Sequence, residues 1–186
     1  SEIEKVLRDV EKLVREHEDL NKKSAEEAER LTRDNKRRVD ESKKRIREIL
    51  KEVDEIIRRT ERKEDLERKL TEVRRRIDKS HKELKEHSDE VVKRLKEILD
   101  RNAEHLEEIE RRIDKILDDV RKRKQGDDKD LRRLAEEAER IKKRLRDSLD
   151  ELRKIIEELE ERNRRINEDH RRDLEDVKRR IEEKSK

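Results

Sequence analysis

The 186-residue chain contains no phenylalanine, tyrosine, tryptophan, proline, cysteine or methionine, and its one glycine is Gly126. Without cysteine there is no disulfide framework, no thiol redox chemistry and no thiolate metal site. Without proline no helix has a built-in break, and without aromatic residues the core must be aliphatic. Because proline forms about 5% of ordinary proteins, its chance absence from such a chain has a probability of roughly one in ten thousand. The composition is therefore suited to long, uninterrupted helices.

Charge is abundant but balanced. Charged residues make up 62% of the chain and hydrophobic ones 26%, and 59 basic residues face 56 acidic ones, which leaves a net charge of +3. Such mixed charge provides no basic field, so we expect no nucleic-acid partner. No run approaches 18 apolar residues, so we expect a soluble chain with no membrane span and no targeting segment. The composition leaves the cellular compartment open.

Three stripes of apolar or small residues recur at alternating steps of three and four, over residues 3–56, 66–120 and 131–181. This period is typical of coiled coils and long amphipathic helices. It predicts helices over about 2–61, 65–124 and 130–184. Asp65 and Asp130 are the expected N-caps of the second and third helices, and Gly126 is the expected left-handed residue of the second turn.

The lengths of the three segments predict the architecture. Each is near 57 residues, or roughly 85 Å at 1.5 Å per residue, and short connections favour antiparallel neighbours. One helix running through residues 58–65 is excluded, because all eight positions there are polar. We therefore expect an all-α, antiparallel up-down-up three-helix bundle, coiled-coil-like, forming a single domain over residues 1–186.

Histidine, asparagine and serine residues interrupt the stripes, where a polar side chain is costly unless it is hydrogen-bonded. If the chain turns near 61–62 and 125–126, facing residues can be found from their residue numbers. Two residues that face each other on the first and second helices have numbers that add up to about 123, and two on the second and third helices have numbers that add up to about 251. This register gathers the polar residues into three layers across the helices. The layers are His17, Asn21, Asn102, His105 and Ser148; then Asn35, His87, Ser88 and Asn163; then Ser42, His81 and His170, with Asn167 close to the last.

Aliphatic layers that alternate with these Asn/His/Ser layers, charged outer faces and the Gly126-Asp127-Asp128 turn resemble de novo designed helical bundles with buried hydrogen-bond networks. The resemblance covers the whole chain and implies an origin and a fold rather than an activity. In that class, buried networks set register and partner choice, and histidine-containing networks have served as pH switches. The commonest members are two-helix hairpins that form dimers or trimers, so the resemblance leaves the oligomeric state open.

The five histidines have three interpretations. In the first, each histidine is a neutral member of a hydrogen-bonded polar layer or a boundary residue. In the second, the histidine-containing layers act as a pH switch. In the third, the histidines bind a metal ion. Burial as a neutral imidazole lowers the pKa below about 6.5, so stability would decline on acidification. Metal binding is the weakest interpretation, since no helix carries a His-x3-His pair and cysteine is absent.

The sequence contains no catalytic motif, so the hypotheses about function rest on the expected fold. With no glycine-rich phosphate loop and no nucleophile elbow, we expect no enzyme, no catalytic residue, no cofactor and no metal. The leading hypothesis is a designed structural scaffold that requires no partner. The alternative is an interaction module that accepts a partner helix or a second copy. It rests on apolar residues beside the stripes: Val6, Leu13, Leu20, Leu50 and Ile57. A spectrin-like spacer is disfavoured because such repeats usually depend on core aromatics.

Overall fold

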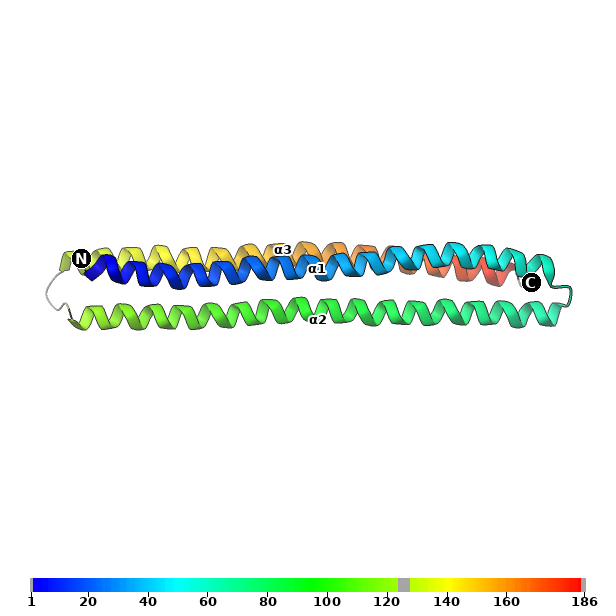
Figure 1. Ribbon diagram of the computed structural model, residues 1–186, viewed down its shortest axis with the longest axis horizontal. Helices are drawn as coiled ribbons and strands as arrows, with labels where there is room; N and C mark the ends of the chain where they lie inside the picture. The colour runs from blue at the N-terminus through cyan, green and yellow to red at the C-terminus, as the bar shows by residue number, and fades with distance from the viewer. Residues whose placement is uncertain (1, 124–127, 185–186) are drawn as a thin grey trace. The chain divides into compact units, whose positions relative to one another are not determined.

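The computed structural model describes residues 2–123 and 128–184, which form three long helices (Figure 1). They are α1 (Glu2–Arg59), α2 (Lys63–Arg123) and α3 (Asp128–Lys184), and the described residues contain no strand. The expected all-α, antiparallel three-helix bundle is confirmed. The turn expected at Gly126 lies outside the described residues.

Helix ends differ from the expected positions by about one half-turn. α1 ends at Arg59, where the Thr60 amide donates to the Ile56 carbonyl at 3.0 Å. α2 begins at Lys63 rather than Asp65, because the Leu66 amide already donates to the carbonyl of Arg62 at 3.0 Å. α3 likewise begins at Asp128, two residues before Asp130. Asp65 and Asp130 therefore lie in the first turns of α2 and α3, where the positive end of the helix dipole stabilises a carboxylate.

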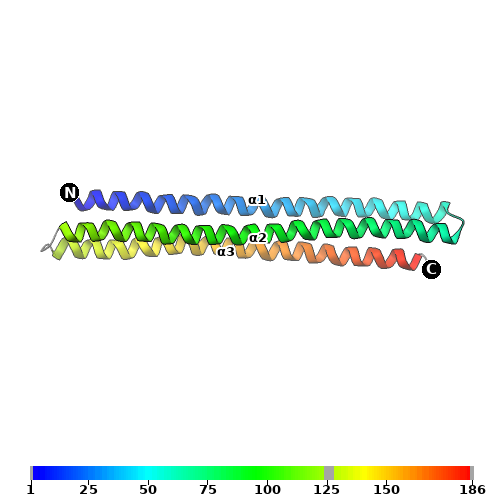
Figure 2. The same cartoon turned by 90° about the horizontal axis from the view of Figure 1, so that it is seen from below.

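Each helix contributes a segment to each of two compact units. Along the chain, α2 runs beside both α1 and α3 (Figure 2). Unit 1 lies within residues 1–29 and 94–158, and unit 2 within residues 30–93 and 159–186. In each unit a segment of α2 packs against segments of α1 and α3. None of the described helices is both long enough and apolar enough to cross a membrane.

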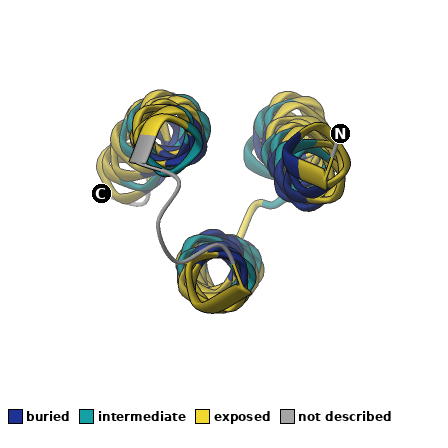
Figure 3. Ribbon diagram, turned by 90° about the vertical axis from the view of Figure 1, so that its left-hand side faces the viewer, coloured by how far each residue is buried: buried dark blue, intermediate teal, exposed yellow. Residues whose placement is uncertain are grey.

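The core of unit 1 is aliphatic, as the absence of aromatic residues requires. Val14, Ile109 and Leu145, one from each helix, are 0% exposed. An end view shows the buried residues of each helix turned toward the other two (Figure 3). Val6 and Leu13, which the sequence places beside the first stripe, are buried here as well. They widen the packed face of α1 instead of remaining on the surface.

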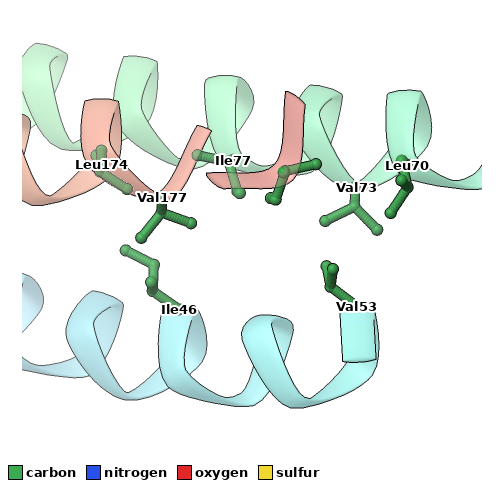
Figure 4. Close-up of a cluster of buried hydrophobic side chains, with 8 residues drawn as sticks. Ile46, Val53, Leu70, Val73, Ile77, Leu174 and Val177 are labelled. Carbon is green, nitrogen blue, oxygen red and sulfur yellow. The ribbon is translucent and has the colours of Figure 1, made fainter. Parts of the chain in front are cut away.

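Unit 2 has its own aliphatic cluster (Figure 4). Leu50 and Ile57, two more of the flanking residues, are partly buried against it. No large hydrophobic side chain among the described residues is exposed. The cluster consists of Ile46 and Val53 from α1, Leu70, Val73 and Ile77 from α2, and Leu174, Val177 and Ile181 from α3.

Candidate functional site

The largest polar network lies inside unit 1 and joins all three helices. Nδ1 of His17 on α1 lies 2.9 Å from Nδ1 of His105 on α2. Asn21, one turn along α1, places its Nδ2 3.1 Å from His17 Nε2 and 2.9 Å from the hydroxyl of Ser148 on α3. Asn102 on α2 donates from its Nδ2 to Asn21 Oδ1 at 2.9 Å. His17, Asn21 and Asn102 are buried, while His105 and Ser148 are half-buried.

These contacts define one consistent order of donors and acceptors. Asn21 presents an amide N–H to His17 Nε2, so that nitrogen accepts and His17 carries its proton on Nδ1. His17 Nδ1–H then donates to His105 Nδ1, and His105 carries its own proton on Nε2. The two rings are nearly parallel, at an interplanar angle of 12°. Both imidazoles are neutral in this order.

Ser24 belongs to the same network, although sequence reasoning placed it only on the apolar stripe. Its hydroxyl accepts from Asn102 Nδ2 at 2.9 Å, and the residue is 1% exposed. The sequence contains a signal for this contact, because Ser24 lies one helical turn from Asn21 and both face Asn102. Asn102 Oδ1 is buried and accepts no hydrogen bond from another protein group.

A second network lies inside unit 2 and is made of asparagines and one serine. Nδ2 of Asn35 on α1 donates to Asn163 Oδ1 at 2.6 Å and to Asn167 Oδ1 at 3.1 Å, both on α3. Asn163 Nδ2 and Asn167 Nδ2 both donate to the Ser88 hydroxyl on α2, the former at 3.4 Å. Asn35 Oδ1 is buried without a protein donor.

Asn167, expected close to the layer of Ser42, His81 and His170, makes its hydrogen bonds to Asn35 and Ser88 of the second network. Side chains on a helix tilt toward its N-terminus. Asn167, one turn after Asn163, therefore reaches back over the turn of Asn163 and meets the same partners.

Ser42 and His170 form a smaller contact in unit 2. His170 Nε2 lies 2.9 Å from the Ser42 hydroxyl, and both residues are 2% exposed. His170 Nδ1 is buried without a protein partner. His81, expected in the same layer, is half-buried, and its proximity contributes to lowering the pKa of His170.

His87 lies at the edge of the second network rather than inside it. Its Nε2 is 3.3 Å from Asp34 Oδ2, within ion-pair distance but not oriented as a hydrogen bond. The structure thus joins His87 to a surface carboxylate instead of to Ser88 or Asn163.

Burial lowers the pKa of three histidines. The pKa of His17 falls from 6.5 to about 4, through burial first and the nearby His105 second, while Glu18 opposes the shift. Burial and then Lys43 lower the pKa of His170, with Asp173 opposing. Burial and then Arg38 lower the pKa of His87, with Asp34 opposing. All three shifts favour neutral imidazoles near pH 7.

The surface of unit 1 has a groove of about 660 Å³ between α1 and α3. Ala25, Leu152 and Ile155 contribute its apolar lining. Arg144 on α3 reaches across to α1, with Nη2 2.6 Å from Glu18 Oε1 and Nη1 2.7 Å from Glu11 Oε1. Within residues 2–123 and 128–184, no group of three or more His, Asp or Glu side chains is arranged to hold a metal ion.

Comparisons with known proteins agree with this fold. No protein-family model matches the chain, and no curated protein sequence is similar to it. One solved structure, described as "Computationally designed three helix bundle", superposes with a TM-score of 0.88. The superposition covers 99% of this chain and 92% of that chain, at 20% sequence identity. At this identity the likeness shows the fold: the chain folds as a three-helix bundle.

Proposed function

We propose that this chain is a designed structural scaffold, whose buried networks specify one register of the three helices. The observation that carries the proposal is that each larger network joins α1, α2 and α3 through directional bonds, such as Asn21 to Asn102 and Ser148. Aliphatic contacts tolerate sliding, whereas a shifted register would leave buried amides without partners. The designed origin is supported by the absent residue types and by the description of the similar structure.

A variant without the second network tests this proposal. It combines Asn35→Leu, Asn163→Leu, Asn167→Leu and Ser88→Ala. Replacing buried polar groups with apolar ones is often neutral or stabilising, so the free energy of unfolding should hold or rise. We expect the uniqueness of the fold to fall, which amide NMR would report as more than one set of peaks and light scattering as a mixture of masses.

A matched control changes the aliphatic cluster without removing hydrogen bonds. Ile77→Leu and Ile181→Leu keep side-chain volume in the same unit and should retain one set of peaks. One set of peaks and one mass in the variant without the second network would contradict a role of that network in specifying the register.

The finer proposal is that the scaffold responds to pH. His17 and His170 are buried as neutral rings with a lowered pKa, so acidification would force charge into the cores that hold them. Guanidinium denaturation at several pH values tests this response.

The second candidate function is that of an interaction module, which the groove of unit 1 favours. A partner helix would cover Ala25, Leu152 and Ile155, but it would have to displace the Arg144 ion pairs or pass beside them. Light scattering on the isolated chain separates the two functions. A mass of 23.0 kDa at all concentrations supports the closed scaffold. A mass that rises with concentration, or with an added amphipathic helix, supports the module.

A further inference from the structure

The His17–His105 pair has no free imidazole lone pair in the order of hydrogen bonds described above. The 2.9 Å bridge between the two Nδ1 atoms uses one proton and one lone pair. The amide of Asn21 covers the remaining lone pair of His17 at Nε2. The fourth ring nitrogen, His105 Nε2, carries the second proton. Two ring protons therefore satisfy the neutral pair completely.

One added proton breaks this order. A singly charged pair has three ring protons, one in the bridge and one on each Nε2. The new His17 Nε2–H then points at the amide N–H of Asn21, so that two donors meet. The conflict is resolved when the Asn21 amide turns and its Oδ1 accepts from His17.

Asn21 cannot turn alone. Its Oδ1 accepts from Asn102 Nδ2, which can only donate, so a turned Asn21 would bring two amide N–H groups together. The hydroxyls of Ser148 and Ser24 both donate and accept, so they suit either orientation. If Asn102 turns as well, its Oδ1 accepts from Asn21 Nδ2, and its Nδ2 moves to the buried position that Oδ1 occupies without a partner in the neutral order.

We propose that Asn21 and Asn102 form a two-state amide relay, which turns over as a pair when the His17–His105 pair accepts a proton. Asn102 is a positioning residue in this relay, because it acts on His17 only through Asn21. The inference rests on the proposed pH response and assigns it to named groups.

Charged groups on all three helices surround the pair. Glu18 on α1 opposes the lowering of the His17 pKa, and Arg144 on α3 is paired with that carboxylate. On α2, the surface hollow that His105 lines is also lined by charged residues of both signs: Arg101, Glu104, Glu107, Glu108 and Arg111. A charge test of the relay must therefore be matched with a control that adds charge alone.

The experiment follows the imidazole ¹⁵N shifts of His17 from pH 3 to pH 8 in the full chain and three variants. Asn102→Asp offers only oxygens, so it holds Asn21 in the orientation that accepts from His17. We expect at least about a tenfold rise in the proton affinity of His17, or one pKa unit. Asn102→Leu removes the donor without adding charge, so Asn21 can turn freely, and we expect a rise of at least about threefold.

Ser24→Asp is the matched control. It adds the same charge beside Asn102 but accepts from Nδ2, so it keeps the neutral order. We expect its effect to stay below about threefold. Equal rises in Asn102→Asp and Ser24→Asp would show an effect of charge alone and overturn the relay.

The uncharged variant decides the matter if Asn102→Asp does not fold. An unchanged titration of His17 in folded Asn102→Leu overturns the relay. If the original chain shows His17 charging near its ordinary value of 6.5, the pH response fails with it. A lowered pKa that no variant raises overturns the relay and leaves the pH response standing.

Discussion

At the scale of single residues, the lowered pKa of His17 predicts that the stability of the fold depends on pH. Its side chain is 0% exposed, and its pKa of about 4 lies below the value of 6.5 that applies in an unfolded chain. As the pH falls, the unfolded state binds the proton first. We therefore expect the contribution of His17 to stability to be complete above pH 6.5 and to be lost progressively as the pH falls toward 4.

We predict that His17→Leu flattens the pH dependence of unfolding between pH 7 and pH 4.5. The shift of His17 corresponds to a loss of up to about 3 kcal/mol in the original chain over its full titration. Guanidinium denaturation at several pH values measures the difference. Parallel curves for the two proteins would show that His17 does not carry the effect.

Two substitutions of Asn35 separate the contribution of hydrogen bonding to stability from that of side-chain volume. Asn35→Ala leaves the oxygens of Asn163 and Asn167 without their donor and opens a cavity, so we expect a loss of about 2 kcal/mol. Asn35→Leu fills the space and should lose less. Urea denaturation of both variants gives the comparison, and a larger loss for leucine would contradict it.

At the scale of helices, the aliphatic clusters supply most of the stability. Ile77 on α2 is 1% exposed within the cluster of unit 2, so Ile77→Ala should destabilise by about 3 kcal/mol. Lys79, two residues away on the exposed face, is the control, and Lys79→Ala should stay within about 0.5 kcal/mol. Chemical denaturation of both variants checks the contrast, which similar losses would refute.

The ion pairs between helices contribute less and depend on salt. Arg144 bridges α3 to Glu11 and Glu18 on α1, whereas Arg153 pairs with Asp150 on its own helix. We expect Arg144→Ala to lose about 1 kcal/mol at low salt and little at 1 M salt, and Arg153→Ala to lose almost nothing. Thermal unfolding at both salt concentrations measures this. A loss for Arg144→Ala that persists at 1 M salt would contradict the electrostatic account.

Periodicity predicted the number of helices and their approximate extent, because the alternation of apolar and charged residues is nearly unbroken. It was less accurate within each turn. The stripes included Ile116 and Ile155, which are half-buried, while their neighbours Leu117 and Ile156 are buried. A helix has 3.6 residues per turn, so its packed face drifts relative to a stripe with period 3.5.

The existence of buried Asn/Ser/His networks was also predictable, since polar residues on an apolar stripe need partners. Their exact membership was not, because facing-residue arithmetic fixes a helical turn and not the reach of a side chain. For that reason the arithmetic does not predict the hydrogen bonds of Asn167 to Asn35 and Ser88, or those of Ser24 to Asn102. Donor and acceptor order, on which the relay depends, requires atomic positions.

At the scale of the whole molecule, the missing residue types and the polar networks form one account. Without aromatic residues or methionine, the apolar side chains of the cores are all aliphatic and of similar size, and they specify register weakly. In each unit, a buried network adds directional hydrogen bonds between helices to an otherwise uniform aliphatic core. The central claim is that these amides are hydrogen-bonded inside the fold.

Hydrogen exchange of side-chain amides tests that claim most directly. NMR can follow the NH₂ protons of Asn21, Asn35, Asn102 and Asn163 together with the backbone amides of the buried helices. We predict that the four side chains exchange slowly, with protection approaching that of backbone amides near Val14 and Ile77. Exchange at the rate of exposed asparagines, with the backbone amides still protected, would contradict the account.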